Sequence, residues 1–421
     1  MAGRHPAGFN PNLPTYAIGL ALVGFAVAVV VAAENAFQAS LFGLKLWLDA
    51  VLPALMPFFA LSEILAAFGV IHFLAVLFEP LMRPLFNIPG AGGFALAMGL
   101  VSGYPLGALI TARLCRQRLI NPVEGERLVA LANTADPLFM AGVVAAGFFR
   151  IPELGATLSA AHYLAAMAVG ILGAFHAAQA PSTPAVAAAN RGPTWRRALE
   201  AMARARREDG RPFGTVMGDA IRSAMASMLL IGGTIILFSV LLQVLDRIGL
   251  VRLLAQAAQT VLRAAGISPE LGSAAVRGLL EITNGTQASA QGDAPLLERA
   301  ALASFIIGWS GLSVHAQVAA LVQGTGIRLG PYLRARLLHG LLAAAATVVL
   351  IRLGPGPWLQ TAAEAPEVVP PSGAGALVWH LGWAGRLALL TLAAHGTAAI
   401  LRALARRALR HRFPRAGGKG V

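Results

Sequence analysis

The stretch Met98-Gly-Leu-Val-Ser-Gly-Tyr-Pro-Leu-Gly-Ala108 decides how the rest of the chain is interpreted. It lies inside an apolar segment, yet it carries four residues typical of a break: Ser102, Gly103, Tyr104 and Pro105. Because proline lacks an N–H group and suits the first position of a helix, the stretch predicts helix, break, helix. A similar segment returns as Gly278-Leu-Leu-Glu-Ile-Thr-Asn-Gly-Thr-Gln-Ala-Ser289. Two such segments in corresponding positions of two halves indicate the binding site of a transporter.

The composition places the chain in a membrane. Of its 421 residues, 57% are hydrophobic and only 12% are charged, whereas a soluble domain carries about 25% charge. The net charge of +14 does not indicate nucleic-acid binding, because most arginines sit in short segments that flank apolar runs, as the positive-inside rule predicts. The single cysteine, Cys115, excludes an internal disulfide and a multi-cysteine metal site.

The pattern of apolar runs predicts an all-α polytopic membrane protein with about eight transmembrane helices and two re-entrant helical hairpins. The expected spans cover residues 16–33, 44–68, 124–149, 156–178, 219–245, 299–322, 331–351 and 376–404. We expect the first run to be retained as a span, since it lacks a convincing cleavage site. The expected divisions are an N-terminal tail and first span (1–43), a first repeat (44–180) with a hairpin at 90–114, a basic cytoplasmic linker (181–218), a second repeat (219–352) with a hairpin at 270–290, and a last span with a basic tail (353–421).

The two repeats are related by a shift of 180 residues. This shift aligns pairs of glycine, arginine and proline residues: Gly69 with Gly249, Arg83 with Arg263, Pro89 with Pro269, and Gly92 with Gly272. If both interrupted segments return on the side they entered, the basic segments 113–127, 191–211 and 328–336 and the C-terminal tail all face the cytoplasm. Each repeat then has three spans and a hairpin, so the repeats are inverted. If both segments crossed instead, the basic linker and tail would lie on opposite sides.

Four breaks are expected to meet near the middle of the membrane, at residues 102–105, 133–137, 283–287 and 310–317. Irregular backbone at that depth is tolerated only where it is buried in protein or lines a cavity. A helix that restarts there exposes N–H groups and a positive dipole end, which favour an anionic substrate. The alternative is a set of kinks satisfied by neighbouring helices and water.

Asp136 and Glu281 lie at broken tips and are functional candidates, because a charge in the membrane interior is costly. The alternatives are a helix cap for Asp136 and a protonated or paired structural acid for Glu281. An enzymatic alternative is an intramembrane serine protease, since Gly308-Trp-Ser-Gly311 matches a GxSG pattern and His339 lies on the next helix. That pattern is short and common in a chain rich in glycine and serine, so we expect no enzymatic activity.

Several motifs occur in a fixed order: Leu52-Pro-Ala-Leu-Met-Pro-Phe-Phe-Ala-Leu-Ser-Glu63, Ser102-Gly-Tyr-Pro-Leu-Gly107, Glu281-Ile-Thr-Asn-Gly285, Gly311-Leu-Ser-Val-His-Ala-Gln317 and Arg336-Leu-Leu-His-Gly340. Over residues 52–350 the chain resembles the sporulation integral membrane proteins built from nucleoside-recognition (Gate) domains. The resemblance implies a relative of the concentrative nucleoside transporters and, within the sporulation branch, a carrier of dipicolinate. The family more often has a small residue where this chain has Asp136, so a capping or cation-coupling role suits Asp136 better than contact with an anion.

We therefore expect a secondary-type transporter that moves a small carboxylate metabolite, most simply dipicolinate during spore formation, by alternating access. The alternatives are a carrier of nucleosides or another polar solute, and a non-transporting scaffold or gate subunit. The expected substrate-binding residues are Ser102, Gly103, Tyr104, Asn133, Thr134, Thr283, Asn284, Gly285, Gln287, Ser310, Ser313, His315 and Gln317.

No metal site and no cofactor are expected, and Asp136 and Glu281 are the candidates for H+ or Na+ coupling. The expected partners are a small anion or polar metabolite, the lipid bilayer and a second copy of the chain, with no nucleic acid. The expected location is a bacterial cytoplasmic or spore-associated membrane with both termini in the cytoplasm.

Overall fold

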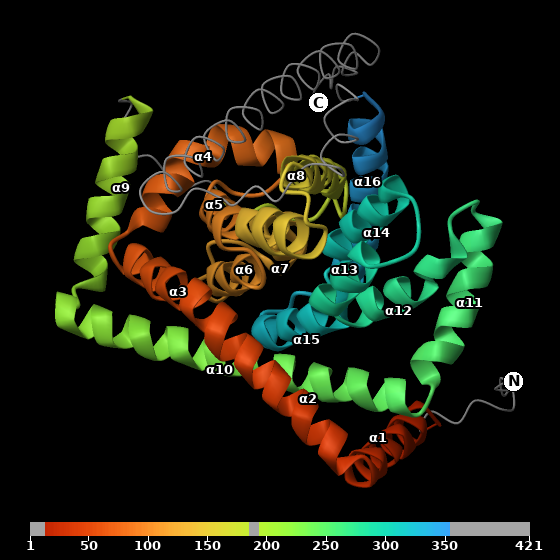
Figure 1. Ribbon diagram of the computed structural model, residues 1–421. Coiled ribbons are helices and arrows are strands. Elements are labelled where there is room, and N and C mark those ends of the chain that lie inside the picture. Colours follow the sequence, from red (N-terminus) through yellow and green to blue (C-terminus); the bar gives the residue numbers. More distant parts are fainter. Residues whose placement is uncertain (1–12, 185–192, 354–421) are drawn as a thin grey trace, which may run out of the picture.

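The structure, a computed structural model, describes residues 13–184 and 193–353 (Figure 1). Within these ranges every regular element is a helix, which confirms the predicted all-α class. The predicted last span, residues 376–404, lies outside the described residues.

Long helices form one side of the molecule. α1 (Leu13–Val31) is followed, after a sharp bend, by α2 (Ala33–Leu46). α2 continues through the π-helical turn η1 (Trp47–Val51) into α3 (Leu52–Ala67). α10 (Phe213–Arg247) is 35 residues long and contains no proline, so nothing interrupts its backbone hydrogen bonds. It packs against α2 and α3, and Figure 1 shows these helices beneath the group of shorter ones.

The shorter helices carry the predicted breaks. α5 (Gly92–Ser102) and α6 (Leu106–Arg116) pack against each other, as do α12 (Gly272–Leu280) and α13 (Ile282–Ala290) after the short turn η3 (Pro269–Leu271). Two further helices are interrupted, α7 (Pro122–Ala132) before the π-helix η2 (Leu138–Phe148), and α14 (Leu296–Trp309) before α15 (Gly311–Val322). α8 (Leu154–Gly173) and α16 (Leu329–Leu353) are unbroken and complete the group.

Three helices lie wholly outside the predicted spans and hairpins: α4 (Val70–Phe86), α9 (Thr194–Asp209) and α11 (Leu250–Ala264). Most of α2 was not predicted either, because it lies between the expected spans 16–33 and 44–68. α9 lies within the stretch expected to be a linker, and it packs Ala198 and Ala201 against Val76 of α4. α10 begins at Phe213, earlier than the predicted start of the fifth span at residue 219. The stretch was expected to be a basic linker because it is rich in proline and arginine, yet it also contains alanines and arginines that favour a helix.

The lengths of the described helices limit how many can cross a membrane. Four are long and apolar enough: α8, α10, the α14–α15 pair and α16. The number rises to six if each of two bent pairs is one span, and these bend by 97° between α1 and α2 and by 84° between α3 and α4. The chain is thus an integral membrane protein of four to six candidate spans within residues 13–184 and 193–353.

The 180-residue shift also relates the local structure of the two halves. Gly69 precedes α4 with a φ of 80°, and Gly249 precedes α11 with a φ of 77°. Both lie in the left-handed region, which glycine adopts at no steric cost. α5 begins at Gly92 and α12 at Gly272, again 180 residues apart. The repeated motif is therefore a glycine corner, a helix, and a pair of helices packed on each other.

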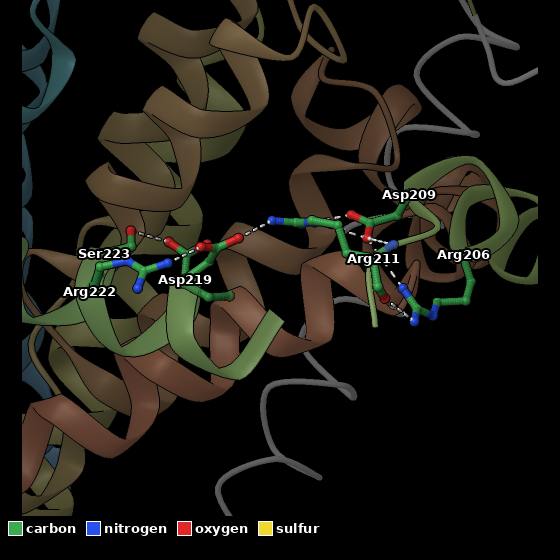
Figure 2. A network of polar contacts seen from close by, with 7 residues as sticks. Arg206, Asp209, Arg211, Asp219, Arg222 and Ser223 are labelled. Carbon is green, nitrogen blue, oxygen red and sulfur yellow. Dashed lines mark hydrogen bonds and ion pairs between the residues drawn. The ribbon is translucent and has the colours of Figure 1, made fainter. Parts of the chain in front are cut away.

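A network of charges connects α9 to α10 (Figure 2). Arg211 reaches Asp209 at 2.7 Å and Asp219 at 2.8 Å, and Asp219 also pairs with Arg222. The hydrogen bond from Arg211 holds the pKa of the Asp209 carboxyl below its usual value. Since that pKa is lowered in the folded state, the pairing stabilises α9 at neutral pH and is lost as the pH falls through it. Next to this network, Ser223 donates a hydrogen bond to Glu63 at 2.7 Å.

Glycines allow the interrupted helices to approach closely. A Cβ on Gly107 of α6 would lie 2.1 Å from the carbonyl oxygen of Ala132, and a Cβ on Gly285 of α13 would lie 2.1 Å from the Cα of Gly278. Real Cβ atoms do not come this close to backbone, so a side chain at either position would force the helices apart. Gly285 therefore serves packing between α12 and α13.

Gly107→Ala is accordingly expected to destabilise the protein by about 1–3 kcal/mol, the usual cost of overpacking. Thermal unfolding of the purified protein in detergent measures this loss. Gly233→Ala on α10 is the matched control, because its Cβ would meet nothing within 4 Å. An equal melting temperature for the two variants would contradict the close packing of α6 on α7.

Candidate functional site

A break lies at or next to each of the four predicted places, although one falls just before the predicted residues and another is shorter than expected. Between α12 and α13 the chain is extended only at Glu281, with φ −147° and ψ 131°, so all of the expected break at 283–287 is helical. Between α14 and α15 the break is confined to Ser310, with φ 72°, and Gly311, with φ 75°. The other two lie at Gly103, with φ 74°, and at residues 133–137. Polar residues alone could not show where the backbone turns, since threonine, asparagine and serine are also tolerated inside buried helices.

Side chains from distant parts of the chain bond the carbonyl groups next to the breaks. Tyr104 donates to the carbonyl of Ile307 at 2.8 Å, and Trp309 Nε1 donates to Leu279 at 3.0 Å. The same role falls to Tyr163 on Leu100 O at 3.1 Å and to Arg336 on Asn133 O at 2.9 Å. Thr134 adds a hydrogen bond at 3.1 Å to Gly99 O, which also accepts the N–H of Gly103. Buried carbonyl groups need such partners, so each broken helix end depends on a different part of the chain.

Carboxylates cap two of the N-terminal helix ends. Asp136 Oδ1 accepts the N–H of Phe139 at 2.9 Å, at the start of η2. Glu281 accepts the N–H groups of Thr283 at 2.9 Å and Asn284 at 2.7 Å, and the side-chain amide of Asn284 at 2.8 Å. These helix ends were predicted to attract an anionic substrate, but residues of the chain already supply the negative charge. The start of α15 at Gly311 has no side-chain cap.

A cavity of 260 Å³ lies where the breaks meet α2, η1, α3 and α10. Its apolar lining includes Leu55 of α3 and Ile231 and Ile235 of α10. Its polar lining comes from both halves of the chain: Tyr104, Asp136, Glu281, Thr283, Asn284, Ser313 and Gln317, with Ser239 from α10. A few convergent polar groups in a largely apolar cavity are typical of a small-molecule site. We therefore take this cavity as the candidate site.

The other expected site residues lie outside this lining. Gln287 is exposed, and Gly103 and Gly285 have packing roles, since a Cβ on Gly103 would lie 2.6 Å from Asp136 Oδ2. Asn133 donates to the hydroxyl of Tyr332 at 2.9 Å. The remaining ones have buried side chains: Ser102, Thr134, Ser310 and His315. The Ser102 hydroxyl and both His315 ring nitrogens have no hydrogen-bond partner among the described residues.

A larger cavity of 620 Å³ lies between α1, α2 and α10. Ser40 is the only residue in its lining with a polar side chain, so it offers little to orient a charged solute. A third cavity, of 260 Å³, lies beside Glu126, Arg127 and His176. Glu126 is paired there with His176 at 2.7 Å and Arg328 at 2.6 Å, which indicates a structural ion cluster. No group of three or more potential metal ligands occurs in the described part of the chain.

Arg336 lies in surroundings that its sequence context did not predict. It was assigned to a basic cytoplasmic segment at 328–336, but its side chain is 0% exposed and contacts two of the breaks. The sequence contained a sign of this position, because Arg336 lies within the predicted span 331–351 and an arginine inside a span is a functional candidate by default. The neighbouring Arg328 and Arg334 made it look like part of a basic flank.

The geometry does not form the serine–histidine pair that a protease requires. The Ser310 hydroxyl donates to the carbonyl of Trp309. His339 uses one ring nitrogen on Arg336 and the other on the carbonyl of His162, both at 2.9 Å. In this structure neither nitrogen of His339 is therefore free to accept a proton from Ser310.

Comparison with known proteins identifies the family of the chain. Residues 48–190 match the Gate family, described as nucleoside recognition. The chain is 41% identical over 327 residues to the sporulation integral membrane protein YlbJ of Bacillus subtilis (strain 168), which covers 77% of this chain and 80% of that protein. No solved structure matches the chain.

The family match defines the class of the chain, which is a membrane protein with a Gate domain. Within that class, the chain belongs to the family of sporulation integral membrane proteins that includes YlbJ.

Proposed function

We propose that the protein is a membrane transporter for a small carboxylate metabolite, dipicolinate during spore formation, and that it works by alternating access. The observation that carries this proposal is the 260 Å³ cavity, because polar groups from breaks in both halves of the chain converge on it. Broken helices that meet at a cavity are typical of transporter binding sites. The sporulation family supports a spore-related solute.

The cavity offers distinct surroundings for the parts of such a substrate. The uncapped start of α15 carries Ser313 and Gln317, whose hydroxyl and amide groups suit one carboxylate together with the helix dipole. Leu55 and Ile231 offer an apolar surface for a flat ring. Asp136 and Glu281 would repel a dianion, so the substrate would bind only when a proton or a cation neutralises these acids. This is the physical reason to propose coupling to H+ or Na+ there.

The proposed membrane arrangement follows from the charges. α5–α6 and α12–α13 would be re-entrant hairpins that enter from opposite sides, in two inverted repeats of an eight-span protein with both termini in the cytoplasm. The basic residues of α9 then lie on the cytoplasmic side, as the positive-inside rule requires. A second copy of the chain is the proposed partner in the membrane.

Uptake into proteoliposomes tests the transport proposal. Saturable uptake of labelled dipicolinate, inhibited by unlabelled dipicolinate and not by nucleosides, is the expected result. Saturable uptake of nucleosides alone would assign the cavity to the nucleosides that the family description mentions. Uptake that does not saturate for either solute would contradict the carrier and favour a scaffold.

A further inference from the structure

Arg336 places a positive charge in the interior of the protein without a carboxylate beside it. The side chain is 0% exposed. Its guanidinium donates to the carbonyl of Asn133 at 2.9 Å and to the hydroxyl of Tyr104 at 2.5 Å, and it meets His339 Nδ1 at 2.9 Å. No carboxylate oxygen lies within 4.0 Å of it in residues 13–184 and 193–353. A buried charge of this kind is costly unless something else compensates it.

The carboxyl ends of two broken helices supply that compensation. Asn133 is the C-cap of α7, and Arg336 bonds its carbonyl directly. Ile307 lies in the last turn of α14, and its carbonyl accepts the Tyr104 hydroxyl that Arg336 also contacts. The end of a helix carries about half a negative charge, so two such ends balance one guanidinium. The Tyr104 ring adds a cation–π contact, with its centroid 5.3 Å from Arg336 Cζ.

The two histidines beside Arg336 are neutral in this arrangement. His339 Nδ1 accepts from the guanidinium, so its Nε2 carries the hydrogen and donates to the carbonyl of His162. His162 Nε2 in turn accepts the N–H of Ala135 at 3.0 Å. The guanidinium is thus the positive charge of this centre, and the histidines orient it.

In transporters with unwound helices, free carbonyls and helix C-termini are the groups that hold a coupling cation. We propose that the Arg336 guanidinium is a tethered cation that fills this position between the ends of α7 and α14, so that the centre binds no dissolved cation. One consequence rests on the proposed transport function: coupling to an ion or proton then falls to Asp136 and Glu281, on the cavity side of Tyr104.

Chemical rescue of Arg336→Ala tests this inference without any transport assay. Thermal unfolding of the purified full chain in detergent is compared in choline, sodium and guanidinium chlorides, at equal low concentrations and fixed ionic strength. We expect the variant to melt about 5–10 °C below wild type in choline. Guanidinium should restore part of this loss, and sodium a smaller part. Arg334→Ala, an exposed arginine on the same helix, should behave as wild type throughout.

Two outcomes of that experiment would overturn the inference. One is a loss that no cation restores, or that choline restores as well as guanidinium does. The other is a saturable effect of sodium on the wild type that disappears in the variant, because a dissolved cation would then bind at this centre.

If Arg336→Ala does not accumulate, Arg336→Lys and Arg336→Met decide the matter, since both are long and only lysine keeps the charge. Lysine should melt closer to wild type, and equal losses would overturn the inference. Because none of these measurements involves a substrate, failed uptake by the wild type would reject the proposed function and leave this result standing.

Discussion

Replacing Glu281 with alanine is expected to lower uptake of the substrate at least roughly tenfold. The Glu281 carboxylate accepts three hydrogen bonds, from the N–H of Thr283 and from the N–H and side-chain amide of Asn284. Loss of an N-cap costs about 0.5–2 kcal/mol, and hydrogen bonds to a charged group are worth about 1.5–3 kcal/mol each. Since about 1.4 kcal/mol corresponds to a factor of ten, a misplaced tip of α13 accounts for the expected loss.

Initial rates in proteoliposomes measure this effect, with the amount of reconstituted protein determined separately. Glu270→Ala is the control, because Glu270 lies in the same part of the chain and is exposed. Glu281→Gln should fall between wild type and alanine, since an amide has only one acceptor oxygen for three donors. Unchanged uptake by Glu281→Ala would remove the α12–α13 break from the proposed site.

Replacing Asp136 with asparagine is expected to separate folding from coupling. Asparagine caps a helix about as well as aspartate does, so the bond to the N–H of Phe139 and the start of η2 should persist. The charge that lines the cavity is lost. Uptake driven by an imposed pH or sodium gradient should therefore fall by roughly a factor of ten or more, on the scale of a contact worth about 1.4 kcal/mol or more.

Exchange of labelled for unlabelled substrate without a gradient provides the internal control for Asp136→Asn, and it should continue. Asp136→Ala should lose both activities, because it removes the cap as well as the charge. A wild-type response of Asp136→Asn to both gradients would show that this acid is a structural cap only.

Composition and local pattern were sufficient for part of the molecule. The scarcity of charge indicated a membrane protein, and the sequence around Ser102–Pro105 predicted the separation of α5 from α6. These features depend on neighbouring residues, since proline and glycine restrict or free the backbone wherever they occur. The 180-residue shift likewise aligned Gly69 with Gly249, and both glycines precede a helix with left-handed backbone.

The partners of the breaks could not be predicted in the same way. Tyr104 and Ile307 are 203 positions apart, and Arg336 and Tyr104 are 232 positions apart. No local rule relates residues at such distances. α4 and α11 were also missed, because prolines within α4 and the mixed character of α11 differ from the long apolar runs that indicate spans.

The sequence by itself therefore determined the class of protein and the presence of four interruptions, because each depends on residues that are close along the chain. Only the tertiary structure decided what the interruptions do. It showed that Asp136 and Glu281 cap the helix ends that were expected to bind an anionic substrate. It also showed that Arg336 is buried beside the ends of two helices. The physical reason is that a buried charge is stable only beside its compensating groups, and packing alone brings those groups together.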